Sequence, residues 1–250
     1  MSLLPGVLPL LLVLTFFVVL WLSAWTGVKV RRAHVDEPAQ FSVVLGATLT
    51  LLGLIIGFTF SMAISRYDQR KNYEEEEANA IGTEYVRADL LPATSAAKVR
   101  SLLGRYLAQR ILFYGARNTR ELAQINETTA RLQTELWSAV QAPASAQPSA
   151  VVALAVSGMN DVLNAQGYTQ AAWLNHIPTE GWVLMALIAV CANLLLGYGS
   201  RQAQREKMLL VLPLILSISF FLIADIDSPR RGLILISPQN LISLSHSLRP

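Results

Sequence analysis

Two aspartates end the last strongly apolar run of the sequence, and two arginines follow them closely. Asp225 and Asp227 come first, and Arg230 and Arg231 stand a few positions later. Ionisable groups at the end of a membrane segment either line an ion path or pair with a group of opposite charge. Of these two roles we favour a structural ion pair at the membrane boundary, and the ion path stays open as the alternative.

Four successive glutamates, Glu74 to Glu77, form the other concentration of charge. Carboxylate oxygens are the ligands that a calcium ion binds. Four successive residues of a helix, however, point around much of its cylinder and cannot all converge on one ion. We therefore interpret these glutamates as a solvated helix face that balances Arg70 and Lys71, and we expect no metal site.

The residue patterns of familiar catalytic and cofactor sites do not occur in the sequence. It contains no phosphate-binding glycine loop, no HExxH or CxxC motif and no nucleophile elbow. His34, His176 and His246 lie in separate polar segments, and Cys191 is the only cysteine. One cysteine can form no disulfide within the chain and offers no zinc site. We therefore expect no enzyme activity and no cofactor.

The composition is that of a membrane protein. Of the 250 residues, 53% are hydrophobic and 15% are charged, whereas about 25% of an average soluble domain is charged. The 20 basic residues are interleaved with 17 acidic ones, so the net charge of +3 does not mark a nucleic-acid-binding surface. We expect the lipid bilayer to be a partner and nucleic acid not to be one.

Four apolar runs are long enough to be membrane helices. The second, residues 41–65, carries no formal charge, and at about 1.5 Å per residue it crosses a roughly 30 Å hydrocarbon layer with tilt. Between the second and third runs, apolar residues recur at helical spacing and no strand pattern occurs. We expect a helical bundle there, with residues 141–150 as a linker and Gly167 as the end of its last helix.

The predicted fold is therefore an all-α membrane protein with four transmembrane helices and an extramembrane helical bundle between the second and third. Its parts are transmembrane helices 1 and 2 in residues 1–65, the bundle in 66–180, transmembrane helices 3 and 4 in 181–226, and in 227–250 a C-terminal tail that packs on protein or on the membrane surface.

Small residues recur every four positions along the second membrane run. They are Gly53, Gly57, Ser61 and Ser65. Such a ridge lets another helix approach closely in lipid, where no hydrophobic driving force brings helices together. We expect it to be a helix-packing ridge that serves self-association.

The same run carries a family resemblance. Gly57 and Phe58, followed by Arg66 and the aromatic Tyr67, are similar to the second membrane helix of bestrophin anion channels. More closely, the chain resembles the bacterial bestrophin-like membrane proteins, through its membrane segments and the ending IADIDSPRRG at 223–232. The resemblance implies a bacterial inner-membrane protein with a bestrophin-like fold, self-association as a pentamer and anions as the conducted ions.

Thr50, Leu54 and Phe58 are spaced by four residues and lie along a helix face beside the glycine ridge. In the alignment that the resemblance implies, Leu54 and Phe58 match apolar residues that narrow the bestrophin pore, whereas Thr50 departs from that pattern. In the alternative interpretation, the three side chains face lipid or a neighbouring helix. The acid-rich calcium clasp of animal bestrophins has no equivalent, because Asp225 and Asp227 are too few to form it.

Charges near the membrane give conflicting indications of orientation. The two short loops share one side, and their excess of Lys and Arg places that side in the cytoplasm. The bundle and both termini are then extracytoplasmic. The resemblance implies the opposite arrangement, which Arg66 and Arg70 on the bundle side partly support. We adopt the orientation given by the loops, whose basic residues are Lys29, Arg31, Arg32, Arg201, Arg205 and Lys207.

Two functions are compatible with these features. The first is a homo-oligomeric membrane channel, with anions as the implied ions, in which the second transmembrane helix supplies a hydrophobic neck that closes by dewetting. The alternative is a non-conducting scaffold or sensor whose helical bundle binds a protein partner. A membrane enzyme would need convergent catalytic groups, and the sequence offers none.

Overall fold

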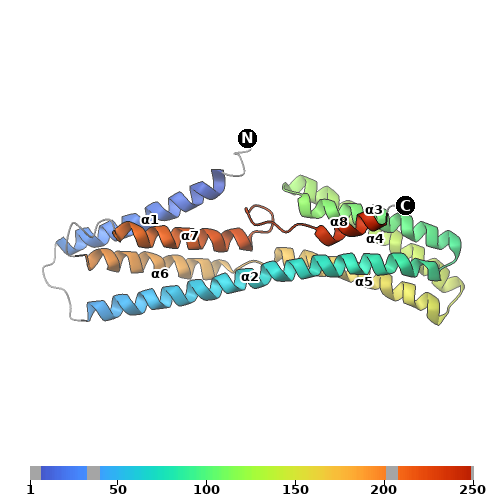
Figure 1. Cartoon of the computed structure of the whole chain (residues 1–250), viewed down its shortest axis with the longest axis horizontal. Helices are drawn as coiled ribbons and strands as arrows, with labels where there is room; N and C mark the ends of the chain where they lie inside the picture. The colour runs from blue at the N-terminus through green and yellow to red at the C-terminus, as the bar shows by residue number, and fades with distance from the viewer. Residues whose placement is uncertain (1–6, 33–39, 201–207, 249–250) are drawn as a thin grey trace. The chain divides into compact units, whose positions relative to one another are not determined.

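Two compact units make up the chain, and both are helical (Figure 1). The structure is a computed structural model that describes residues 7–32, 40–200 and 208–248. No strand occurs in these ranges, so the predicted all-α class is confirmed. The membrane unit consists of Met1–Ser65 and His176–Ile234, and the bundle unit consists of Arg66–Asn175 and Leu235–Pro250.

Long apolar helical segments form the membrane unit. Four helices of the described chain are long and apolar enough to cross a bilayer, which confirms the four predicted transmembrane helices. In lipid every backbone N–H and C=O must be bonded within the protein, and a helix achieves this within one segment. The segments are α1 (Val7–Arg32), the part of α2 (Phe41–Arg87) that ends at Ser65, α6 (Thr179–Tyr198) and α7 (Met208–Asp227).

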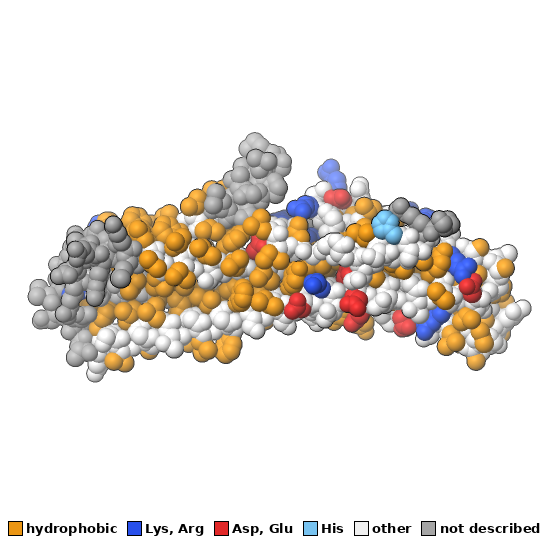
Figure 2. Space-filling model, viewed as in Figure 1, with side chains coloured by type: hydrophobic (Ala, Val, Ile, Leu, Met, Phe, Trp, Pro, Cys, Tyr) orange, Lys and Arg blue, Asp and Glu red, His pale blue; other side chains and the backbone are white. Residues whose placement is uncertain are grey.

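All four segments contribute to one apolar core. Leu20 of α1, Leu52 of α2, Met185 of α6 and Phe220 of α7 are buried in a single cluster. The rings of Phe16 and Phe220 pack edge to face, with 5.2 Å between their centroids. Many hydrophobic side chains also lie on the face of this unit that Figure 2 shows, as contact with lipid requires.

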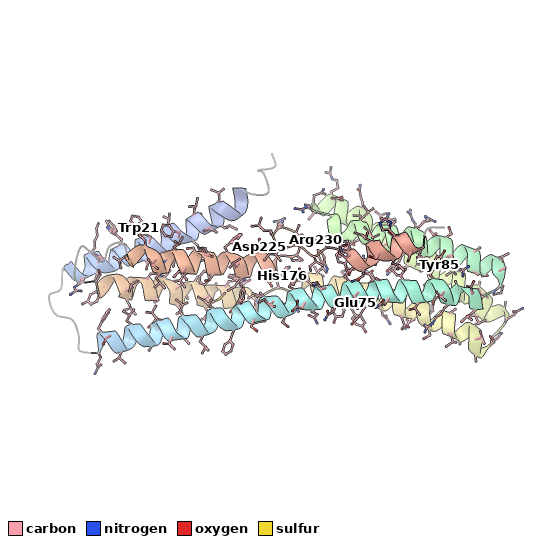
Figure 3. The ribbon with its side chains drawn as sticks, viewed as in Figure 1. Trp21, Glu75, Tyr85, His176, Asp225 and Arg230 are labelled. Carbon is pink, nitrogen blue, oxygen red and sulfur yellow. The ribbon has the colours of Figure 1, made fainter. Side chains whose placement is uncertain are left out.

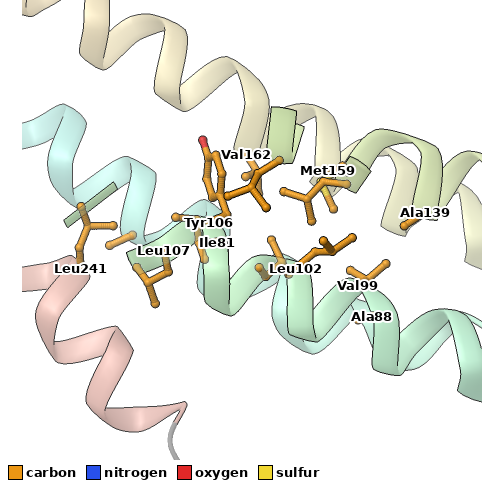
Figure 4. Close-up of a cluster of buried hydrophobic side chains, with 14 of the residues drawn as sticks. Ile81, Ala88, Val99, Leu102, Tyr106, Leu107, Ala139, Met159, Val162 and Leu241 are labelled. Atoms are coloured by element: carbon orange, nitrogen blue, oxygen red, sulfur yellow. The ribbon is translucent and has the colours of Figure 1, made fainter. Parts of the chain in front are cut away.

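The bundle unit surrounds a second apolar core (Figure 4). Ile81, Tyr106, Ala139, Met159 and Leu241 each come from a different helix and are buried together. Each helix turns one apolar stripe toward this core. The elements are the part of α2 beyond Ser65, the short 3-10 helix η1 (Ala88–Leu90), α3 (Ala93–Gly115), α4 (Thr119–Ala146), α5 (Ala150–Leu174) and α8 (Gln239–Ser247).

Capping side chains fix where α4 and α5 begin. The side-chain oxygen of Asn118 accepts a hydrogen bond from the N–H of Glu121 at 2.7 Å, and the hydroxyl of Ser149 accepts one from Val152 at 3.2 Å. Each bond satisfies one of the first N–H groups of a helix, which have no partner within the helix itself.

Two boundaries predicted inside the bundle are wrong. The linker predicted at 141–150 is shorter, because α4 runs on through Pro143 to Ala146 and only residues 147–149 join it to α5. The side chain of Pro143 is buried, and its packing offsets the hydrogen bond that proline cannot make. Helix α5 passes Gly167 and ends at Leu174. A glycine costs about 1 kcal/mol in a helix, and burial of Trp173 beyond it favours continuation.

The apolar C-terminal tail packs on protein. Its helix α8 lies against α3 within the bundle unit, and Leu241 is fully buried there. The sequence analysis predicted protein or the membrane surface as the support for this tail. In this structure the bundle of the same chain supports α8.

Candidate functional site

One face of α2 in the membrane unit is exposed, and it carries the three candidate neck residues. Thr50 is exposed, Leu54 is 53% exposed and Phe58 is 65% exposed. The opposite face of the same helix is buried, with Leu52 at 2% and Thr59 at 7% exposure. Because a helix turns about 100° per residue, one helix presents both faces. The three candidates therefore lie together on a surface that the described residues leave exposed.

The predicted helix-packing ridge is open on the same side of α2. A Cβ atom built at Gly53 or Gly57 would meet nothing within 4 Å from another part of the described chain. Ser61 and Ser65 are exposed as well. The described residues of one protomer thus supply no helix that packs on this ridge, and its use in self-association stays a prediction.

A close helix contact that the sequence analysis missed joins α1 to α6. A Cβ atom at Gly197 would fall on the carbonyl oxygen of Ala24 and 2.7 Å from its carbonyl carbon. At Gly27 it would fall on the carbonyl oxygen of Leu194 and 2.8 Å from the backbone nitrogen of Tyr198. Only glycine fits at either position, because the obstacle is backbone. Both apolar runs contain small residues, which are typical of close helix contacts in membranes. Their spacing in the sequence, however, does not show which helix each of them contacts.

The aspartate that comes first at the end of α7 binds backbone amides. The carboxylate of Asp225 accepts hydrogen bonds from the N–H groups of Leu233 at 2.7 Å and Ile234 at 2.8 Å. It thereby folds the segment after α7 back onto the end of the helix. Figure 3 labels Asp225 and Arg230 in this region. The ion pair with Arg230 or Arg231 stays a prediction.

The second aspartate ties α7 to the start of α6. The carboxylate of Asp227 accepts a hydrogen bond from the N–H of Ile177 at 3.0 Å, and its backbone oxygen lies 2.9 Å from Nδ1 of His176. Both aspartates are buried. Hydrogen bonds to a carboxylate from N–H groups satisfy a charge that burial would otherwise make costly. These contacts give the two aspartates a structural role at the end of α7.

The interpretation of Glu74 to Glu77 as one solvated face is wrong for its first and last members. Glu75 and Glu76 are exposed, whereas Glu74 and Glu77 are buried. The carboxylate of Glu74 accepts hydrogen bonds from Nδ2 of Asn240 at 2.6 Å and from the N–H of Leu241 at 2.9 Å. This contact anchors α8 to α2. The α-helical geometry explains the split, because residues three positions apart share a face and the two between them point away.

Glu77 forms a buried ion pair with an arginine of α3. Nε of Arg110 donates to its carboxylate, both side chains are 0% exposed, and Thr169 of α5 donates to the same carboxylate at 3.2 Å. Burial, followed by the negative charge of Glu77, raises the pKa of Tyr106 and of Tyr114 beside this pair. Both phenols therefore stay neutral, and the pair is a structural element of the bundle interior.

Arg70 closes the end of α5, a role that the sequence analysis did not predict. Its side chain is 0% exposed, and it donates to the backbone oxygens of Ala172 at 3.0 Å and Asn175 at 2.8 Å. The last carbonyl groups of a helix lack partners within it, and a cation there also complements the helix dipole. Local sequence spacing does not reveal this role, because the partners lie 102 and 105 positions away.

No metal-binding cluster occurs in the described ranges. No group of three or more His, Cys, Asp and Glu side chains among them could hold a metal ion. The buried side chains of Arg70, Glu74, Glu77 and Arg110 are bonded to backbone or side-chain groups in ways that close the fold. The free α2 face is therefore the strongest candidate for a functional surface.

Comparisons with known proteins agree with this architecture. The model of a family described as Bestrophin-like domain matches residues 10–241. No curated protein matches the sequence. A variant of a bacterial bestrophin homologue from Klebsiella pneumoniae aligns with a TM-score of 0.70 at 11% identity, covering 94% of this chain and 97% of that chain. Another structure of this homologue, phased with zinc, aligns with a TM-score of 0.66 at 13% identity. The alignment covers 95% of this chain and 98% of that chain. Identities this low show a shared fold alone.

Proposed function

This chain belongs to the Bestrophin-like domain family, and from that membership we propose that it is a homo-oligomeric membrane channel. The free face of α2 carries the proposal. Thr50, Leu54 and Phe58 are exposed there, while the opposite side of α2 builds the core of the membrane unit. A ring of copies, five if the assembly is that of bestrophins, brings these faces around one axis.

In such a ring, Leu54 and Phe58 form a hydrophobic neck. A narrow apolar ring expels water and so raises the barrier for an ion that must keep its hydration shell. Gly53 and Gly57 beside the neck let neighbouring α2 helices approach closely. Thr50 adds a hydroxyl one turn from Leu54. The family resemblance points to anions as the conducted ions.

Ion flux through lipid bilayers that contain the purified protein tests the channel. We expect Phe58→Ala to widen and wet the neck, so that flux rises, and to leave thermal stability nearly unchanged because Phe58 is 65% exposed. Leu52→Ala is the matched control on the same helix. Leu52 is 2% exposed, so its truncation should cost about 2–5 kcal/mol of stability without raising flux.

Two results would count against the channel. One is a loss of stability in Phe58→Ala with no flux in either protein, because Phe58 would then be packed between helices. The other is a purified assembly without a ring of α2 helices around an axial opening. Either result leaves the scaffold as the better explanation.

A scaffold or sensor is the second candidate, and exposed apolar side chains of the bundle unit favour it. Val86 is 68% exposed, and Val151 and Leu154 are each 51% exposed. A contiguous apolar patch exposed outside a membrane is typical of a surface that binds a protein partner, and these side chains are candidates for such a patch. In that case the membrane unit only anchors the bundle.

We place the protein in the bacterial inner membrane, with the bundle and both termini extracytoplasmic. Arg201, Arg205 and Lys207, which carry part of the charge argument, lie outside the described residues. A cysteine introduced at the exposed Ser145 should react with an impermeant thiol reagent on intact cells, while Cys191 within the membrane stays protected. Labelling only after the cells are opened would reverse the orientation.

A further inference from the structure

Glu84 is a fully buried carboxyl group where α2 meets α5 in the bundle unit. Its side chain is 0% exposed, and neither carboxylate oxygen has a hydrogen-bond partner. A Cβ atom at Gly158 of α5 would fall on Oε2 of Glu84. The carboxyl group therefore rests directly on the backbone of α5, and the glycine makes room for it.

Two charged side chains face this carboxyl group. Arg87 lies one helical turn beyond Glu84 on α2, and its Nη1 is 3.8 Å from Oδ2 of Asp161 on α5. These two side chains are 34% and 61% exposed. On η1 and α3, Asp89 and Arg100 form an ion pair with each other. Arg87 therefore stands between a buried carboxyl group and an exposed carboxylate.

Burial determines which protonation state of the Glu84 carboxyl group is favoured in the folded protein. A buried carboxylate without a hydrogen-bond donor is far more costly than a neutral carboxyl group. Burial raises the pKa of Glu84 from 4.5 to about 8, the charge of Arg87 lowers it, and the charge of Asp161 raises it. The protonated form is thus the one that fits between α2 and α5 at neutral pH.

We propose that Glu84 is a proton-operated switch of the bundle unit: it is buried and neutral when protonated, and on losing its proton it draws Arg87 away from Asp161. The exchange changes the packing of α2 against α5 and leaves Asp161 unpaired at the surface. The switch does not depend on the proposed channel, although it acts on the helix that carries the candidate neck.

The direction of the pH effect follows from the raised pKa. The folded protein holds the proton of Glu84 more tightly than the unfolded chain does. Stability from this group is therefore fully present below its ordinary value of 4.5 and is lost as the pH rises through about 8.

Thermal unfolding of the full chain in detergent, measured between about pH 5 and pH 9.5, tests the switch. We expect the melting temperature of the wild type to fall across this range. In Glu84→Gln, which stays neutral, that fall should be largely removed, so that the variant melts above the wild type at pH 9. The exposed Glu75 on the same helix provides the control, and Glu75→Gln should follow the wild type. An unchanged pH dependence in Glu84→Gln would refute the proposal.

Two further measurements separate a switch from a merely structural carboxyl group. The infrared band of a protonated carboxylic acid should be present in the wild type at pH 6 and disappear with a midpoint near pH 8. Its absence at pH 6 overturns the proposal even if Glu84→Gln fails to fold. Asp161→Asn removes the charge that opposes ionisation and releases Arg87, so it should move the midpoint to lower pH. A midpoint that stays in place would refute the exchange of Arg87.

Discussion

Glycines lie on two helix faces of the membrane unit, and their surroundings are opposite. At Gly27 of α1 and Gly197 of α6, the backbone of the facing helix occupies the space that a side chain would need. At Gly53 and Gly57 of α2, the described chain places nothing within 4 Å of a Cβ atom. One face is closed within the protomer, and the other is open.

The difference shows what small residues do in lipid. Since no hydrophobic driving force brings membrane helices together, close backbone contact supplies much of the attraction, and glycine permits that contact. The α1–α6 contact uses its glycines to build the protomer. The open α2 face has the same residue type but no partner within the described chain, so it is available to a second copy.

The largest effect on folding is expected from a large side chain placed in the α1–α6 contact. Gly197→Leu places a side chain on the carbonyl group of Ala24, and because the obstacle is backbone, α1 and α6 must separate. We expect little or no folded protein, measured as the yield of a single species in detergent chromatography. Wild-type yield and melting temperature in this variant would show that the contact does not hold the membrane unit together.

An intermediate effect is expected in the bundle unit, where a closed glycine meets side chains that can move. Gly158→Ala displaces the carboxyl group of Glu84 and crowds Arg87, whose Nη1 would lie 2.7 Å from the new Cβ atom. We expect a loss of about 1–3 kcal/mol, as for other overpacked cores, measured by denaturant unfolding.

Gly167→Ala is the control on the same helix. Nothing lies within 4 Å of a Cβ atom at Gly167, so alanine should stabilise α5 by up to about 1 kcal/mol through helix propensity. Equal effects of the two substitutions would mean that the contact with Glu84 is not what distinguishes the two glycines.

The smallest effect on the protomer is expected at the open face. Gly57→Leu meets no obstacle in the described chain, so the protomer should lose no stability, and helix propensity should change the unfolding free energy by at most about 1 kcal/mol. The same substitution should weaken self-association, because a large side chain keeps neighbouring α2 helices apart. The mass of the assembly in detergent measures this. An oligomer of unchanged mass would remove the glycine ridge from the interface.

Local pattern predicted the elements of this protein well. The uncharged length of residues 41–65 is sufficient to predict a membrane helix, because lipid leaves an apolar segment of that length few alternatives. The spacing of Thr50, Leu54 and Phe58 was likewise sufficient to place them on one face, since helical periodicity is a property of the segment itself. Their exposure within the protomer agrees with a role at a free surface, and the neck stays a prediction.

What the sequence alone determined is thus the set of membrane helices, the all-α class and the side chains that share a helix face. Only the tertiary structure decided which faces are closed. Glu77 accepts a hydrogen bond from Arg110, which is 33 positions away in the sequence. Glu74 accepts one from the N–H of Leu241, which is 167 positions away. The glycines of α1 and α6 meet in the same way, across most of the chain. Periodicity fixes the direction of a side chain relative to its own helix, but its partner depends on how distant helices pack, and that is settled by the summed contacts of the whole unit.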